Sequence, residues 1–155
     1  MRNAVNRALE IVIVVLLALM TLDVLYGVAT RYLLNNQSEW SDELSRFLMI
    51  WVSILGAAYA AGSNLHISID LLPRYLSEKG RRRLHMFISV IVILFVFAVF
   101  VVGGLRYIYI SFTLGQVSPA LQLPVGYVYV VLPLSGLFII YYKLHDLMQL
   151  IQPRR

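Results

Sequence analysis

Asp23 is the residue of this sequence that packing alone explains least well. It follows the uncharged apolar stretch Ile11–Leu22. A carboxylate placed among apolar residues is costly within a membrane and often serves a function. One interpretation is a site that binds a coupling ion or carries a proton. The alternative is a buried structural pair, or a position close to the lipid head groups.

The spacing around Asp23 favours the structural interpretation. Asp23, Gly27 and Arg31 are four residues apart, so they lie on one face of a helix. We expect this face to pack against protein, with Arg46 or Arg106 as the partner of the carboxylate. A lone acid with no second carboxylate in a span also makes a poor cation site.

A second group of charged residues is predicted at the same end of the molecule. Arg31 precedes a short polar connection, while Glu43 and Arg46 follow it three residues apart on the next helix. Arg31 is able to reach Glu43 across that connection. These three residues form either a network that fixes the first two helices or a charged patch for a soluble partner. The two interpretations are compatible.

Other chemistry finds little support in the sequence. The chain has no cysteine, so disulfides, zinc–thiolate sites and cysteine nucleophiles are excluded. His66, His85 and His145 are scattered and lack metal-ligand spacing. There is no zinc-protease helix, phosphate-binding loop or nucleophile elbow. We therefore predict no enzyme activity, no metal and no cofactor.

The composition of this chain is typical of an integral membrane protein. Of 155 residues, 60% are apolar and only 14% are charged, whereas a soluble domain is about a quarter charged. A span needs about 20 mostly apolar residues. The sequence predicts a single all-α membrane domain, residues 1–155, with spans at about 9–32, 40–61, 84–106 and 124–143. A short amphipathic helix starting near Pro73 is expected at the membrane surface between the second and third spans.

Basic residues predict the orientation. Ten of the 13 Lys and Arg residues fall before the first span, between the second and third, or after the fourth. The positive-inside rule then places both termini in the cytoplasm. The triplet Arg81-Arg82-Arg83 suits anionic lipid head groups better than nucleic acid. The first apolar segment is too long for a cleaved signal, so we expect it to remain as an anchor.

Small residues recur where helices are expected to pack closely. Ser53, Ala57 and Ala61 are four apart in the second span, with Gly56 beside them, and Gly103-Gly104 and Ser135-Gly136 offer similar patches. The middle of the third span is Val, Ile, Leu and Phe throughout, and the fourth offers only Pro133 and Ser135. A transport path needs polar groups at the midplane. Four such helices are therefore poorly suited to transport a charged solute alone.

The order of several motifs resembles a known family. The chain is similar to the small membrane (DctQ-type, Q) subunit of tripartite ATP-independent periplasmic (TRAP) transporters. The resemblance rests on a set of segments along the chain: Arg31-Tyr32, Trp40-Ser41-Asp42-Glu43-Leu44-Ser45-Arg46, Trp51, Gly56-Ala57-Ala58-Tyr59-Ala60, His66-Ile67-Ser68-Ile69-Asp70-Leu71-Leu72 and Leu123-Pro124. The second half resembles the family mainly in hydropathy.

The resemblance implies a location in the bacterial inner membrane and two partners. One is a large membrane subunit that carries substrate and sodium, and the other is a periplasmic substrate-binding protein. The small subunit would be the fixed scaffold of an importer of organic acids such as dicarboxylates or sialic acid. By the same resemblance, Arg31, Trp40, Glu43 and Arg46 shape the periplasmic side. Further structural positions would be Asp23, Trp51, Gly56, His66 and Asp70.

One alternative stays open. A self-sufficient small transporter or channel, built as an oligomer of four-helix chains, would use Asp23 as its coupling carboxylate. Uptake by this chain in the absence of a large subunit separates the two hypotheses.

Overall fold

Four helices long and apolar enough to cross a membrane dominate the structure. The computed structural model describes residues 2–33, 38–63 and 78–151. The four candidate spans are Ala4–Leu33, Glu39–Gly62, Gly80–Thr113 and Val125–Met148. The prediction of an all-α membrane protein with four spans is confirmed. The surface helix expected near Pro73 lies outside the described residues, and the orientation stays a prediction.

The helices enclose the first three predicted spans, and the fourth starts one residue later than expected. They are α1 (Arg2–Leu33), α2 (Glu39–Gly62), α3 (Glu78–Val96), the π-helical η2 (Phe97–Gly103), α4 (Gly104–Thr113), α5 (Val125–Tyr129) and α6 (Val131–Ile151). The third span is one continuous helical rod of α3, η2 and α4. Its 34 apolar-rich residues are about 50 Å long at 1.5 Å per residue, which exceeds a hydrocarbon core of about 30 Å.

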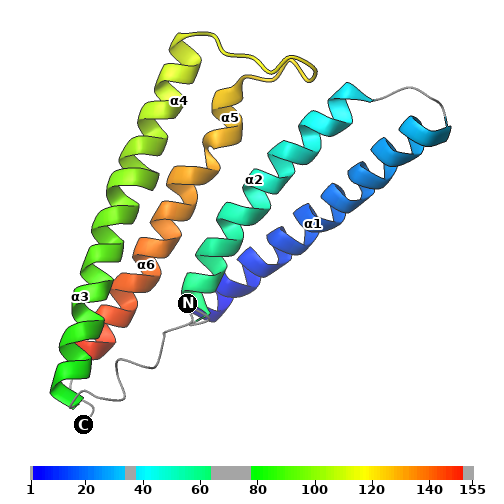
Figure 1. Cartoon of the computed structure of the whole chain (residues 1–155). Coiled ribbons are helices and arrows are strands. Elements are labelled where there is room, and N and C mark those ends of the chain that lie inside the picture. The colour runs from blue at the N-terminus through cyan, green and yellow to red at the C-terminus, as the bar shows by residue number, and fades with distance from the viewer. Residues whose placement is uncertain (1, 34–37, 64–77, 152–155) are drawn as a thin grey trace.

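The helices form an open row rather than a closed bundle. Figure 1 shows α1 at one edge, then α2, then α5 and α6, with α3 and α4 at the other edge. The main neighbour of α1 is α2, and α6 packs between α2 and the third span. We call the end that carries the α1–α2 connection and the α4–α5 loop the Arg31 end. The opposite end, where α1 and α3 begin, is the Arg81 end.

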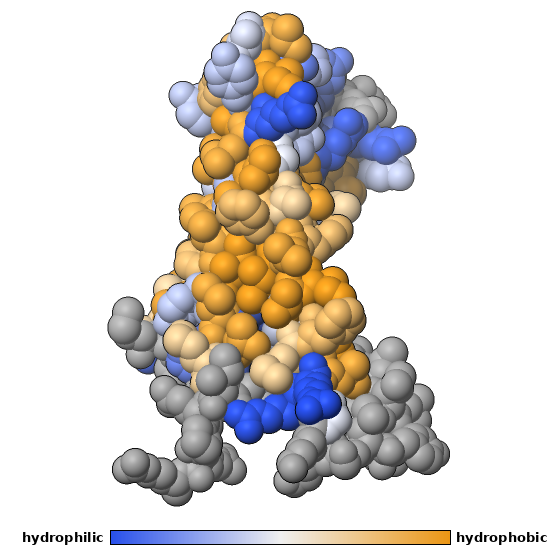
Figure 2. Space-filling model, turned by 90° about the vertical axis from the view of Figure 1, so that its left-hand side faces the viewer, coloured by the Kyte–Doolittle hydropathy of each residue, from blue (hydrophilic) through white to orange (hydrophobic). Residues whose placement is uncertain are grey.

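The core lies where α2 meets α6. Leu55 of α2 is buried together with Val131 and Tyr142 of α6. Ala58 and Ala61 of α2 are buried in a second cluster, with Ile139 of α6 and Val96 of α3. Gly62 closes this contact, because a Cβ there would lie 2.6 Å from the Tyr142 ring. The third span, in contrast, leaves most of its apolar side chains exposed, and Figure 2 shows a continuous apolar band between hydrophilic ends. This band is suited to contact with lipid or with another membrane subunit.

The loop between α4 and α5 is short and well ordered by its own hydrogen bonds. Gly115, at φ +60°, ends α4 in a Schellman motif: Gln116 N donates to the Ser111 carbonyl at 3.0 Å and Gly115 N to the Phe112 carbonyl at 3.1 Å. The helix therefore continues to Thr113, seven residues beyond the predicted end of the third span at residue 106. Glycine is needed here because its missing Cβ permits the left-handed conformation.

Candidate functional site

Asp23 joins α1 to α2. Its side chain is 8% exposed and accepts hydrogen bonds from Ser41 Oγ at 3.0 Å and Ser45 Oγ at 2.6 Å. Ser41 Oγ also lies 3.0 Å from the Asp23 carbonyl oxygen. Gly27 allows this approach, since a Cβ there would lie 2.9 Å from Ser41 Oγ. The carboxylate is thus placed in a helix–helix contact and hydrogen-bonded on both oxygens.

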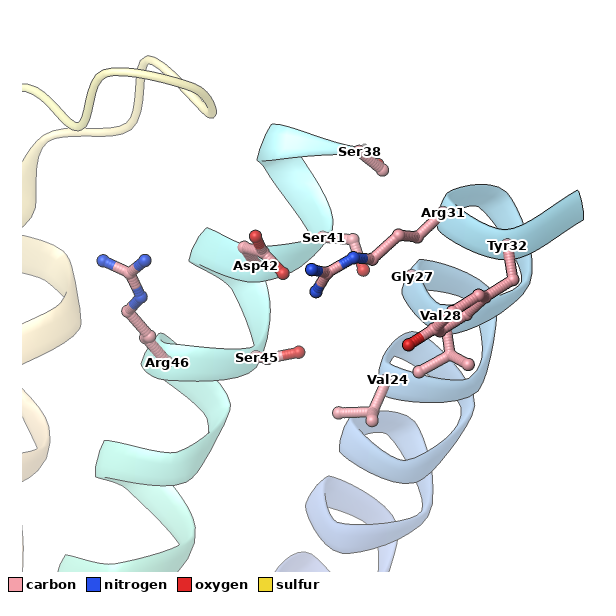
Figure 3. A pocket seen from close by; sticks show the side chains of 10 residues that line it. All are labelled: Val24, Gly27, Val28, Arg31, Tyr32, Ser38, Ser41, Asp42, Ser45 and Arg46. Carbon is pink, nitrogen blue, oxygen red and sulfur yellow. The ribbon is translucent and has the colours of Figure 1, made fainter. Parts of the chain in front are cut away.

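The prediction that Arg46 or Arg106 pairs with Asp23 is wrong. Its partners are the two serines, and the reason is helical geometry. Ser41 and Ser45 are one turn apart and lie on one face of α2, whereas Arg46 is rotated about 100° from Ser45 around the same helix. In Figure 3 the Arg46 side chain extends away from α1. The serine hydroxyls are short enough to let the two helices come together.

Glu43 ties α2 to the loop between α4 and α5. Its Oε2 accepts hydrogen bonds from the backbone N–H groups of Ala120 at 2.9 Å and Leu121 at 2.8 Å. The loop tip is preformed: Ser118 N donates to the Leu123 carbonyl at 2.9 Å, and Val125 N to the Gln116 carbonyl at 3.0 Å. Two neighbouring N–H groups aimed at one oxygen make a small anion-binding turn. Glu43 therefore uses backbone donors, where an arginine was expected.

Trp51 ties α2 to the broken fourth span. Its Nε1 donates to the Val128 carbonyl at 2.9 Å. The fourth span is interrupted between α5 and α6, close to Pro133, whose missing N–H leaves a carbonyl in the preceding turn without its usual donor. The carbonyl freed by the proline is that of Tyr129, four residues earlier, and Trp51 bonds to the adjacent Val128 carbonyl in the same turn. Trp51 is placed to stabilise this break.

A groove separates α1 from α2 at the Arg31 end. It holds about 460 Å³, and the lining comes from both helices: Val24, Gly27, Val28, Arg31, Tyr32, Ser38, Ser41, Asp42, Ser45 and Arg46. Arg31 extends from α1 toward α2 in Figure 3. Trp40 stands beside Tyr26 of α1, with ring centroids 5.3 Å apart. Arg31 and Trp40 thus flank the α1–α2 contact.

The predicted small-residue patches divide into two kinds. Gly104 and Gly136 lie in tight contacts between the third and fourth spans, since a Cβ would lie 2.9 Å from Pro133 Cδ or from Phe100 Cβ respectively. Gly56 meets nothing within 4 Å, and its neighbour Ala57 is exposed. The face of α2 that carries Gly56 is therefore left uncovered by the described part of this chain.

The Arg81 end contains the remaining predicted residues. Arg81, Arg82 and Arg83 are exposed at the start of α3. His66 and Asp70 lie outside the described residues. Within residues 2–33, 38–63 and 78–151, no group of three potential metal ligands comes together.

Several partners could not be named from the sequence. The serines at positions 41 and 45 belong to the recognised motif, and their four-residue spacing opposite Asp23 is the signal that would have identified them. The loop N–H groups at 120 and 121 and the Val128 carbonyl belong to the backbone, which no residue type marks. All three connections start from side chains of α2 or end on them.

Comparison with known proteins agrees with this architecture. The family described as tripartite ATP-independent periplasmic transporters, DctQ component, matches residues 20–152. A provisionally named TRAP transporter small permease protein of Haemophilus influenzae is 32% identical over 87% of this chain and 82% of its own length. The sialic acid TRAP transporter small permease protein SiaQ of Vibrio cholerae is 32% identical over 66% of this chain and 60% of its own length.

A third relative is the ectoine TRAP transporter small permease protein TeaB of Halomonas elongata, 30% identical over 83% of this chain and 67% of its own length. The matched residues include α2 and all of the helix–helix connections described above. The chain belongs to the DctQ component family of TRAP transporters, and it is a multi-pass transporter permease subunit rather than an enzyme.

Proposed function

We propose that this chain is the fixed scaffold subunit of a TRAP transporter in a bacterial inner membrane. The observation that carries the proposal is the use of its polar side chains. Asp23, Glu43 and Trp51 are each hydrogen-bonded to another element of the same chain. A subunit whose polar groups hold helices together has few left to line a path for a charged solute.

The open row of helices supports a partner of many spans. The apolar face of the third span and the uncovered Gly56 face of α2 are available for packing in lipid, where close helix contact drives association. We propose a large TRAP membrane subunit as that partner, with a periplasmic binding protein delivering the substrate. The large subunit would carry the substrate and the coupling sodium ions.

Orientation and substrate belong to the same proposal. The bias of basic residues supports two cytoplasmic termini, and we therefore propose that the Arg31 end faces the periplasm. Relatives are named for sialic acid, ectoine and C4-dicarboxylate transport. We propose that the complex imports an organic acid of this kind with a sodium gradient.

Reconstitution tests the proposal. Proteoliposomes are prepared with this chain alone, with the large subunit alone and with both, and the binding protein is added outside. Uptake of labelled sialic acid, ectoine and succinate is measured with and without an inward sodium gradient. We expect sodium-dependent uptake of one substrate only when all three proteins are present. Sodium-dependent uptake by this chain alone would overturn the scaffold role.

Asp23→Asn separates the scaffold from the alternative of a self-sufficient transporter. The asparagine side chain keeps the size of the carboxylate and loses its charge. If Asp23 is structural, the assembled complex shows less stable assembly or little change, with the same dependence of uptake on sodium concentration. If Asp23 couples ion and substrate, sodium dependence is lost in a complex that still assembles.

A further inference from the structure

The groove between α1 and α2 contains a cation without a counterpart. Arg31 is exposed and lines the groove, and it has no hydrogen-bond or ion-pair partner among the described residues. Figure 3 shows its guanidinium held between the two helices and pointing toward α2. An arginine placed this way presents several N–H donors to an oxyanion.

Further donors face the same space. Ser38 lines the groove, and its Oγ is buried with no hydrogen-bond partner among the described residues. Ser38 is also the N-cap residue that directly precedes α2, so the positive end of the helix dipole lies beside it. The groove thus combines a guanidinium, an unpaired hydroxyl and a helix start.

The charges of the residues that line the groove restrict which anionic ligands fit it. Arg31 supplies the positive charge that points into the groove, because Arg46, although it lines the rim, extends away from α1. Asp42 already has an interaction of its own. A singly charged phosphodiester matches one guanidinium, whereas a polyanion would leave charge uncompensated.

The surroundings favour a lipid over a free anion. Val24 and Val28 line the groove and are 44% and 48% exposed, so they offer an apolar wall below the guanidinium. The Tyr26–Trp40 ring pair lies nearby, and such aromatic residues collect at the membrane interface. Asp23 lies eight residues deeper in α1, or about 12 Å. Arg31 also lies two residues before the end of the candidate span Ala4–Leu33, where we expect phospholipid head groups.

We propose that this groove binds one phospholipid, with its phosphodiester on Arg31 and Ser38 and an acyl chain along Val24 and Val28. The site is independent of the transport role proposed above. It would fill the space that remains between α1 and α2 beyond the close approach of Gly27 to Ser41.

Native mass spectrometry of the full chain tests the site. The purified protein is delipidated in detergent and titrated with dioleoyl-phosphatidylglycerol. We expect one tightly bound lipid per chain. Its affinity should fall at least tenfold in Arg31→Gln and remain unchanged in Arg106→Gln, because Arg106 is exposed on α4 and does not line the groove. Val28→Trp, which fills the apolar wall and keeps every charge, should weaken binding as well.

Three outcomes would overturn the proposal. Equal losses of lipid affinity in Arg31→Gln and Arg106→Gln would mean that the lipid is held by general electrostatic attraction and not by a specific site. Equal binding of glycerol phosphate, which has no acyl chains, would identify an oxyanion pocket rather than a lipid site. Loss of the bound lipid upon addition of the large subunit would identify the partner as the occupant. Circular dichroism and gel filtration of Arg31→Gln, whose exposed side chain supports no packing, check that the fold is retained.

Discussion

The bond between Glu43 and the α4–α5 loop leads to the sharpest prediction. Replacement of Glu43 by alanine removes the acceptor of both loop N–H groups, at Ala120 and Leu121. A hydrogen bond to a charged group contributes about 1.5–3 kcal/mol. The Glu43 side chain is only half-buried, so water replaces part of the loss. We therefore expect the loop tip to lose about 2–4 kcal/mol of local stability.

Amide hydrogen exchange measures this loss directly, because it reports the free energy of local opening. A change of about 2–4 kcal/mol corresponds to exchange that is roughly 30- to 1,000-fold faster, since about 1.4 kcal/mol is a factor of ten. The acceleration should be confined to residues 114–124. Glu43→Gln retains an uncharged acceptor oxygen, so its effect should be about half as large in free energy.

Glu39→Ala is the matched control. Glu39 lies one turn earlier on the same helix and is exposed, so its removal should leave the loop amides unchanged. If Ala120 and Leu121 exchange at the wild-type rate in Glu43→Ala, the carboxylate does not hold the loop. The same conclusion follows if Glu39→Ala accelerates them equally.

Three further predictions concern the other connections. Ser45→Ala removes the 2.6 Å bond to Asp23 and should lower the unfolding free energy in mixed detergent micelles by about 1.5–3 kcal/mol. The control Ser53→Ala, on the exposed side of α2, should change it by less than about 0.5 kcal/mol. Equal effects of the two variants would contradict a stabilising Ser45–Asp23 bond. Trp51→Phe loses the bond to the α5 backbone and should cost about 1 kcal/mol, measured against Trp40→Phe by the same unfolding assay. Gly104→Ala forces a methyl group against Pro133 and should cost about 1–3 kcal/mol, whereas Gly56→Ala meets no atom and should be neutral in the isolated chain.

The sequence predicted the fold well because lipid restricts the choices. Each span of about 20 apolar residues can be recognised from its own segment of the sequence, and all four predicted spans correspond to helices in the structure. The close contact of Gly104 and Gly136 with the neighbouring helix also followed from residue size. The π-helical η2 was missed, since its residues, Phe97–Gly103, are as apolar as the flanking turns and nothing in the local pattern marks the change of pitch.

The candidate site was predicted only in part. The residues at the Arg31 end were correctly gathered at one end, but charge complementarity gave the wrong partners for Asp23 and Glu43. Side chains in lipid satisfy carboxylates with the nearest donors, and here these are hydroxyl and backbone groups. The backbone donors come from a loop 77 and 78 residues away along the chain. Sequence spacing alone does not reveal contacts across such a distance.

The contact between Asp23 and the two serines has a consequence for how the chain enters the membrane. α1 emerges from the ribosome first and carries a carboxylate that costs about 2.5–3.5 kcal/mol when it is inserted near the middle of an isolated helix, and less toward its end. The two hydroxyls that bind it arrive 18 and 22 residues later. Insertion of α1 and α2 together as a helical hairpin satisfies the carboxylate before it meets lipid, so the first two helices are best suited to leave the insertion machinery as a pair.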